Sequence, residues 1–210
     1  MKPQKKLISR LLVLCAGFMI LGTAASLFVY SNLGSDPINM LSQGVARIIE
    51  LEVGTTNILI QLFFFLILLL VGRKRIGLGT FVGIFIIGGM MNLWAIVLVP
   101  RLGETLLPVR LVCVVAAPIL VGFGVAMVQL ADLGMVPNDL LPLVIFEKIG
   151  KFQFRTVRIA YDLSHFTIGL LLGGIFGIGT ILSAFLTGPS IQWALALFRR
   201  RNMFRFGEDE

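Results

Sequence analysis

The stretch Leu33-Gly34-Ser35-Asp36-Pro37 recurs one hundred residues later as Leu133-Gly134-Met135-Val136-Pro137. The same offset, with no gap, pairs Gly77-Leu78-Gly79-Thr80 with Gly177-Ile178-Gly179-Thr180. These matches fall on turn-forming and polar residues, and not only on the Leu and Ile that an apolar chain contains everywhere. One constant offset indicates a duplicated unit, and in a hydrophobic chain an internal repeat points to transporter architecture.

The composition places this chain in a bilayer. Of its 210 residues, 57% are hydrophobic and only 14% are charged, and the mean hydropathy is +0.96. A soluble domain of this size could not bury so much apolar surface. We therefore expect membrane lipid around the protein. We interpret the net charge of +7 as a signal of membrane orientation, and we expect no nucleic-acid partner.

Six apolar runs are long enough to cross a membrane, since a spanning helix needs about 20 residues. They lie near residues 8–30, 55–72, 80–100, 109–131, 155–173 and 180–199. The first repeat covers residues 1–104 and the second covers residues 105–210, so each supplies three spans. Because three is odd, the second repeat enters the membrane from the opposite side. The expected fold is all-α, with six transmembrane helices as two inverted three-helix repeats in one membrane domain.

The basic residues agree with this topology, because cytoplasmic loops carry an excess of Lys and Arg. With the N-terminus inside, six spans place every strongly basic cluster on the cytoplasmic side. These clusters are Lys2, Lys5, Lys6 and Arg10; Arg73, Lys74 and Arg75; Lys148, Lys151 and Arg155; and Arg199, Arg200 and Arg201. We expect a multi-pass protein of the bacterial inner membrane with both termini in the cytoplasm.

Two shorter segments, 37–50 and 137–149, follow the repeated Leu-Gly-x-x-Pro stretches. Each runs about 20 Å as a helix, which is too short to cross a bilayer. Gly34 and Gly134 suit helix ends, and the Pro three residues later suits the first turn of a new helix. The segments are either re-entrant half-helices or amphipathic helices on the membrane surface.

The fifth apolar run carries the most polar face. Arg158, Asp162 and His165 stand at i, i+4 and i+7, and Tyr161 neighbours them. An ionisable residue inside a membrane costs several kcal/mol unless it is paired, and such residues often mark a transport pathway. The alternative is structural, with an Arg158–Asp162 pair joining helices and His165 as a hydrogen-bonding neighbour.

The entrances of the two short segments supply further candidates. Asp36 and Asn39 belong to the first, and Asn138 and Asp139 belong to the second. Helix N-termini expose unpaired N–H groups, so two such ends directed inward would suit an anionic group; plain capping is the alternative. Asn57 on the second span adds a polar group that either lines a cavity or bonds between helices.

Glycine and proline interrupt the third span of each repeat. Gly88 and Gly89 in the first correspond to Gly188 and Pro189 in the second, near the bilayer centre. These positions predict hinges or unwound points, most strongly at Pro189, which lacks a backbone donor. The alternative is close helix packing through small residues.

Enzyme and metal signatures are absent from the sequence. A single His excludes a two-His metal site within one chain, and no phosphate-binding loop, nucleophile elbow or zinc-protease motif occurs. We expect a protein that is not an enzyme and that uses no cofactor and no metal. Cys15 and Cys113 sit in apolar runs, where they serve as small packing residues.

These motifs together resemble the YczE/YyaS/YitT-type bacterial integral membrane proteins, the YczE branch above all. The resemblance rests on the two Leu-Gly-x-x-Pro stretches, on Arg155-x-x-Arg158-x-x-x-Asp162, on Gly173-Gly174-x-x-Gly177-Ile178-Gly179-Thr180 and on Gly188-Pro189. It implies a bacterial inner-membrane protein, and it says little about a substrate.

The leading hypothesis is a small secondary transporter of a small organic solute, anionic or lipid-like, with a polar cavity between the inverted repeats. Asp162 would be the proton- or cation-linked group, Arg158 its partner and His165 a tuner. A homodimer fits the small size. The alternatives are a substrate-binding or accessory membrane subunit, and a lipid-handling flippase.

Lys74→Cys, in a chain whose native cysteines are replaced by alanine, tests the topology. The six-span arrangement places position 74 in the cytoplasm, so a membrane-impermeant maleimide should label it only after the cells are permeabilised. Labelling in intact cells would overturn the six-span arrangement.

Overall fold

The computed structural model describes residues 3–102 and 106–201, which form eight α-helices and one short 3-10 helix. The helices are α1 (Pro3–Ser31), α2 (Pro37–Ile49), α3 (Val53–Val71), α4 (Leu78–Leu102), α5 (Leu107–Ala131), α6 (Pro137–Ile149), α7 (Phe154–Leu171) and α8 (Ile178–Arg200), with η1 (Arg73–Arg75) between α3 and α4. Lys2 of the N-terminal basic cluster lies outside these ranges. The described chain contains no strand, which confirms the all-α prediction.

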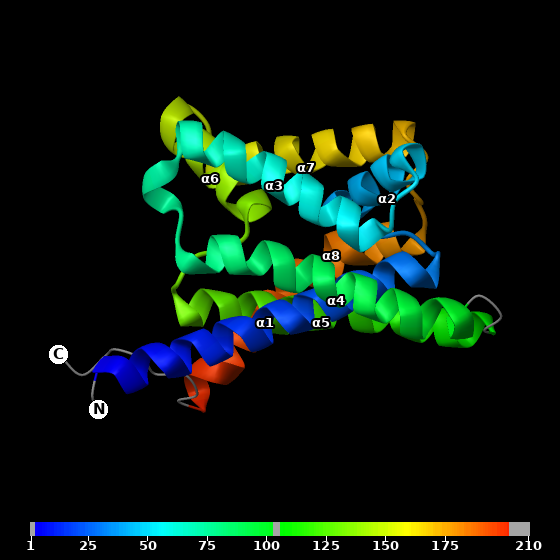
Figure 1. The fold of residues 1–210 in the computed structure, drawn as a ribbon, viewed down its shortest axis with the longest axis horizontal. Helices are drawn as coiled ribbons and strands as arrows, with labels where there is room; N and C mark the ends of the chain where they lie inside the picture. Colours follow the sequence, from blue (N-terminus) through cyan, green and yellow to red (C-terminus); the bar gives the residue numbers. More distant parts are fainter. Residues whose placement is uncertain (1–2, 103–105, 202–210) are drawn as a thin grey trace.

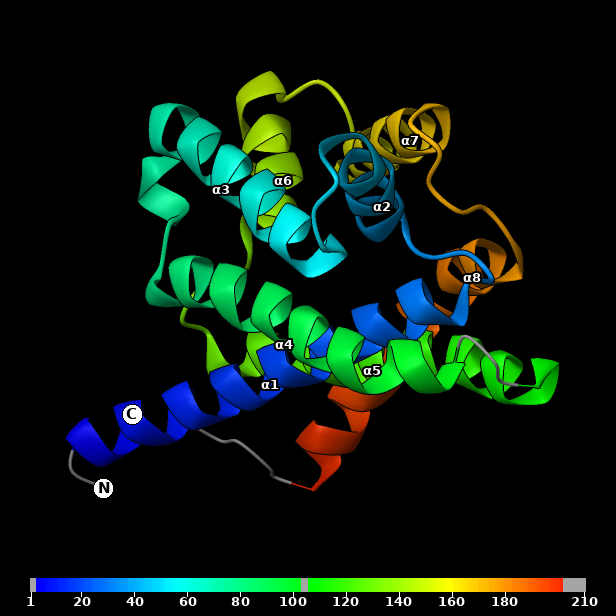
Figure 2. The ribbon, with the colours of Figure 1, turned by 45° about the vertical axis from the view of Figure 1, so that its right-hand side comes forward.

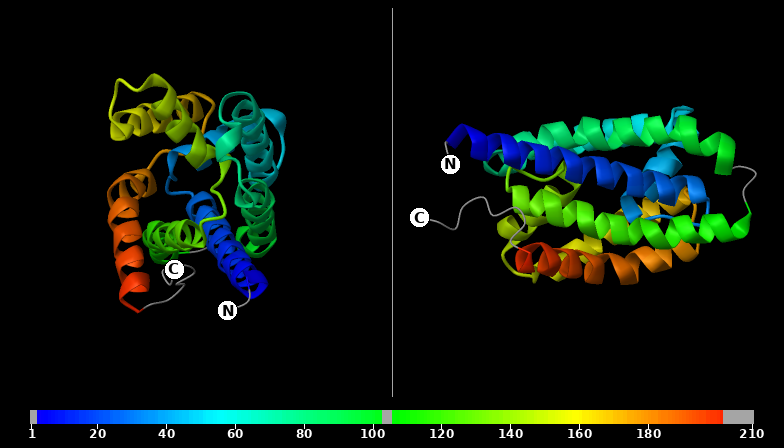
Figure 3. Two further views of the ribbon diagram at one scale, coloured as in Figure 1. Left: turned by 90° about the vertical axis from the view of Figure 1, so that its left-hand side faces the viewer. Right: turned by 90° about the horizontal axis from the view of Figure 1, so that it is seen from below.

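The helix boundaries follow the sequence repeat. Helices α1 and α5 end at Ser31 and Ala131, and α2 and α6 have the same bounds one hundred residues apart. Helices α1, α4, α5 and α8 form one layer, and α2, α3, α6 and α7 form the other (Figure 1). Helix α5 runs antiparallel to α1, and α8 runs antiparallel to α4 (Figures 1 and 3).

Five of the described helices are long and apolar enough to cross a membrane: α1 (from Leu7), α3, α4 (as far as Val97), α5 and α8. Helix α7, expected as the fifth of six spans, is not among them. Its 18 residues include three charged ones, Arg155, Arg158 and Asp162. The helices thus establish a multi-pass membrane protein, while six crossings stay a prediction.

The two short segments are helices of 13 residues, as predicted, and local turn chemistry sets their starts. Gly34 and Gly134 adopt φ angles of 99° and 110°, which glycine reaches without strain. Pro37 and Pro137 begin the helices, and the Asp36 side chain caps α2 by accepting a hydrogen bond from the Asn39 amide at 2.9 Å. More than half of the α2 residues are buried, and the helix packs on α3 and α7.

The two repeats are joined by reciprocal backbone hydrogen bonds. The Gly179 amide donates to the Leu33 carbonyl at 2.8 Å, and the Gly79 amide donates to the Leu133 carbonyl at 2.9 Å. The turn before each short helix is thereby joined to the turn that opens the last helix of the other repeat. A Cβ on Gly34 would meet the Gly177 amide nitrogen at 2.6 Å, so this crossing needs glycine.

Two arginines reinforce the reciprocal arrangement at the ends of α1 and α5. Arg10 on α1 donates from Nε to the Ala131 carbonyl at the end of α5, at 2.7 Å. Arg110 on α5 donates in turn to the Ser31 and Asn32 carbonyls at the end of α1. The last carbonyls of a helix lack partners within the helix and attract cations. These bonds fix the antiparallel register of α1 against α5.

The repeats differ in how their last two long helices meet. Helix α3 packs closely on α4, where a Cβ on Gly54 would meet the Gly88 carbonyl oxygen at 2.5 Å. The corresponding positions are Phe154 on α7 and Gly188 on α8. Over the part of the chain that the structure describes, α7 does not pack along α8, and a Cβ on Gly188 would have no neighbour within 4 Å. Helix α7 instead lies beside α2 (Figure 2).

The candidate hinge positions do not unwind their helices. Helix α4 is continuous through Gly88 and Gly89, and α8 is continuous through Gly188 and Pro189. The expectation of unwound points is therefore wrong, because the single donor that a proline lacks does not end a long helix in this setting. Gly88 instead allows close packing of α4 against α3, which was the alternative interpretation. A hinge role for these residues stays a prediction.

Substituting Gly54 tests the close packing of α3 on α4. Gly54→Ala forces the new methyl group into the Gly88 backbone, and we expect it to lower the free energy of unfolding by about 1–3 kcal/mol. Gly188→Ala is the matched control, since its methyl group meets open space and alanine favours a helix. Thermal unfolding of the purified variants measures both. Equal melting temperatures would contradict this account of the packing.

Candidate functional site

A cavity of about 940 Å³ opens where α7 and α8 part, and the entrances of both short helices line it. Its charged lining residues are Asp36, Asp139, Arg158 and Asp162, and its amide lining residues include Asn39, Asn57 and Asn138. The structure thus brings seven of the nine predicted binding residues to one cavity, drawn from both repeats.

Arg158 joins the two aspartates of the second repeat. Its Nη1 donates to Asp139 Oδ1 at 3.0 Å and its Nε donates to Asp162 Oδ2 at 3.0 Å. The Asp139 bond ties α6 to α7, and the Asp162 bond closes one turn of α7. All three side chains remain about one third exposed, at 30–34%. The pairing offsets much of the cost of charge in an apolar setting while leaving part of each group open to a ligand.

Asp36 brings a third carboxylate to the same cavity from the first repeat. One of its oxygens caps α2, and the group lies within electrostatic range of Asp139 and Asp162. In the described lining, three carboxylates therefore face a single guanidinium. The cavity therefore carries an excess of negative charge, which arises because the carboxylates of both repeats meet there.

Two buried asparagines place amide groups beside these charges. Asn57 Nδ2 donates to Ser42 Oγ at 3.2 Å, and the Asn138 backbone amide donates to Gln61 Oε1 at 3.1 Å. Asn57 and Asn138 are only 2% and 5% exposed, yet Oδ1 of each has no hydrogen-bond partner among the described residues. Buried polar atoms normally have partners, so these two oxygens stand out among the polar atoms beside the cavity.

The other two predicted residues, Tyr161 and His165, do not line the cavity. The His165 ring stacks on Phe64 of α3 with centroids 5.3 Å apart and meets Tyr161 edge-on at 4.3 Å. His165 is 5% exposed and belongs to the contact between α7 and α3. Its position one turn beyond Asp162 suggested a shared face, but the neighbouring α3 covers that end of the face.

Some lining residues were not among those selected from the sequence. They are Gln129 on α5 and Ser183 and Thr187 on α8. Gln129 interrupts an apolar run and corresponds to Val29 in the first repeat, which was a usable signal. A lone Ser or Thr in an apolar helix has no such signal, because it is common wherever helices pack.

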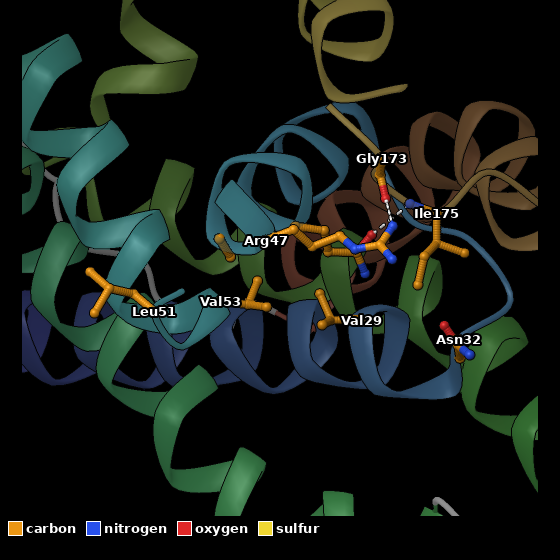
Figure 4. A pocket seen from close by; sticks show the side chains of 9 residues that line it. Val29, Asn32, Arg47, Leu51, Val53, Gly173 and Ile175 are labelled. Carbon is orange, nitrogen blue, oxygen red and sulfur yellow. Dashed lines mark hydrogen bonds between the residues drawn. The ribbon is translucent and has the colours of Figure 1, made fainter. Parts of the chain in front are cut away.

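A second pocket of about 520 Å³ lies at the far end of α2 (Figure 4). Arg47 reaches across it and donates from Nη1 to the Gly173 carbonyl at 2.8 Å, while Gln43 Oε1 accepts from the Ile175 amide at 3.1 Å. Both side chains thus hold the segment 172–177 that connects α7 to α8. These bonds give the pocket a structural role.

Comparison with known proteins places the chain in a family. Residues 8–196 match DUF6198, a family of unknown function. The chain belongs to this family. It is 33% identical over 188 residues to a protein of Haemophilus influenzae, covering 90% of this chain and 84% of that one. It is 28% identical to YyaS of Bacillus subtilis, over 88% of this chain and 91% of YyaS.

The membrane protein YczE of Bacillus subtilis is a further relative, 28% identical over 91% of this chain and 88% of YczE. The resemblance to the YczE and YyaS proteins, which rested on the turn motifs and the fifth apolar run, is therefore confirmed. The membrane assignment agrees with the description of YczE as a membrane protein. No solved structure matches the chain.

Removing Arg158 tests the carboxylate pairing. Arg158→Gln leaves Asp139 and Asp162 facing each other without a cation, and we expect a loss of about 1–3 kcal/mol in the free energy of unfolding. The double variant Arg158→Gln/Asp139→Asn should recover part of that loss. Thermal unfolding measures the cycle. Arg75→Gln, which breaks the more exposed pair with Glu147, is the control and should cost less than about 1 kcal/mol. An equal effect of both single variants would refute the pairing account.

Proposed function

We propose that this protein is a small secondary transporter that moves an organic solute through the cavity between two inverted repeats. The observation that carries the proposal is a cavity lined with charged residues from both repeats, among helices otherwise suited to lipid. Ionisable groups inside a membrane commonly mark substrate or ion paths, and short helices that end near mid-membrane are a common feature of transporter sites. The proposed role is not enzymatic.

In this proposal α7 is the fifth of six spans, and its charges are tolerated because Asp139 and Asp162 pair with Arg158 inside the protein. Helix η1, the connection between α6 and α7 and the end of α8 lie toward the same end as the N-terminus (Figures 1 and 3). These segments carry the basic clusters, which supports both termini in the cytoplasm and a bacterial inner-membrane location. The protein acts as a monomer or a homodimer.

Asp162 is the proposed proton- or cation-linked group, and Arg158 is the partner that sets its charge. The guanidinium contacts two carboxylates at once, so a change of protonation at Asp162 alters how firmly Arg158 holds Asp139. Because Asp139 lies in the first turn of α6 and Asp162 lies on α7, a change of protonation at Asp162 would alter the contact between the two helices. Such a contact is a suitable place to couple ion binding to helix movement.

A flippase for lipids is the second candidate, and one observation favours it. The cavity opens between α7 and α8, where exposed apolar side chains such as Leu163 and Phe185 give a lipid a lateral route. An accessory subunit is the third candidate. Coupled uptake by the purified protein alone would exclude it, and scrambling of a fluorescent lipid in the same liposomes would identify the flippase.

Asp162→Asn tests the transporter. Liposomes containing the purified protein and the pH dye pyranine receive pools of amino acids, organic acids, amines or nucleosides. We expect at least one pool to change the internal pH faster with the wild-type protein than in protein-free liposomes, which report the unaided entry of neutral amines and acids. We expect Asp162→Asn to lower that added rate at least ten-fold while the variant still unfolds in one cooperative thermal transition. Asp132→Asn is the control, since its carboxylate is 91% exposed and, within the described chain, forms an ion pair with Arg10 alone. An undiminished rate in Asp162→Asn would remove Asp162 from the mechanism.

A further inference from the structure

The charge of the cavity argues against an anionic ligand. Its described lining carries Asp36, Asp139 and Asp162 against Arg158, a net charge of −2 when all four are ionised. Arg158 already directs Nη1 and Nε at carboxylates. An anion approaching this guanidinium would meet the two aspartates that hold it. A cation instead meets three carboxylates, and Coulomb attraction is strong where water is scarce.

The hydrogen-bonding groups of the cavity favour a ligand that donates hydrogen bonds. The side chains of Asp139 and Asp162 keep about one third of their surface exposed, and both line the cavity. A carboxylate only accepts hydrogen bonds. A ligand with several N–H groups would donate to these carboxylates, whereas a ligand charge without N–H groups would leave their remaining lone pairs without a donor.

Most of the remaining cavity wall is apolar, and part of it faces sideways. Ile159 and Leu163 on α7 are 56% and 57% exposed, and Phe185 on α8 is 75% exposed. All three line the cavity, along the gap between helices that do not pack together. A small hydrophilic amine would leave this wall unused. A ligand with an apolar body would cover it and would reach the charged end by way of the bilayer.

We infer that the cavity binds an amphiphilic organic amine. Its protonated amino group lies among Asp36, Asp139 and Asp162, and its apolar body lies between α7 and α8. The inference names the substrate class of the site in the proposed function and rests on that site being a transport path. It replaces the anionic solute that the two helix N-termini suggested, because each N-terminus already carries an aspartate of its own.

Matched probes test the class of ligand. Purified protein in phosphatidylcholine nanodiscs is titrated with decylamine, decanoate, decyltrimethylammonium or methylamine, and binding is measured as the shift in melting temperature. We expect decylamine to bind at least ten-fold more tightly than each of the other three. Decanoate tests the charge, decyltrimethylammonium tests the N–H donors and methylamine tests the apolar wall.

Paired variants separate binding in the cavity from partition into lipid. Asp162→Asn and Gly188→Phe should each weaken decylamine binding at least ten-fold, the second by filling the gap beside α8. Asp132→Asn and Gly89→Phe are the matched controls and should leave it unchanged, since Gly89 is exposed on α4 and has no neighbour within 4 Å of an added Cβ.

Decanoate binding as tight as decylamine binding would overturn the inference, as would equal effects of Gly188→Phe and Gly89→Phe. The pyranine assay keeps the two proposals apart. Decylamine that binds with the expected variant pattern but changes the pH no faster than in protein-free liposomes would refute the transporter and leave the ligand class standing. A protein-dependent pH response to organic acids without amine binding would refute the ligand class alone.

Discussion

Each repeat of this protein depends on the other for the turn that positions its short helix. The carbonyls of Leu33 and Leu133 accept hydrogen bonds from Gly179 and Gly79 of the opposite repeat, and the backbones approach too closely for any side chain at Gly34. A buried backbone group without a partner is costly in lipid, so these crossed bonds are a requirement of the fold. They bring both short-helix entrances, and hence Asp36 and Asp139, to a single cavity.

The sequence repeat predicted much of this arrangement because the signals were local. A glycine that ends one helix and a proline that begins the next depend only on neighbouring residues, as does the aspartate that caps α2, and α2 and α6 formed where these signals placed them. The face shared by Arg158 and Asp162 was also predictable from helical periodicity. Periodicity does not say which neighbour covers a face, so His165 was assigned to the cavity although α3 covers it.

The gap between α7 and α8 could not be predicted from either helix alone. It depends on a pair of positions: Gly54 meets Gly88 in the first repeat, whereas Phe154 and Gly188 stand at the matching places in the second. Only the close contact between Gly54 and Gly88 shows that a phenylalanine at the position of Gly54 would keep the two helices apart. The two repeats also differ in charge at this place. Helix α7, on the open side, carries Arg158 and Asp162, whereas α3, on the closed side, carries Ile58 and Leu62 at the same positions.

Phe154 also limits the helix movement that the proposed transport would need. In a perfectly symmetric transporter, the two halves would exchange shapes, and α7 would close on α8 as α3 now rests on α4. A benzyl group cannot occupy the space that a hydrogen atom occupies at Gly54, so closure on this side must stop short or turn the aromatic ring aside. In the proposed transport cycle the two end states would therefore not be equivalent, and the gap beside the charged helix α7 would stay the wider of the two.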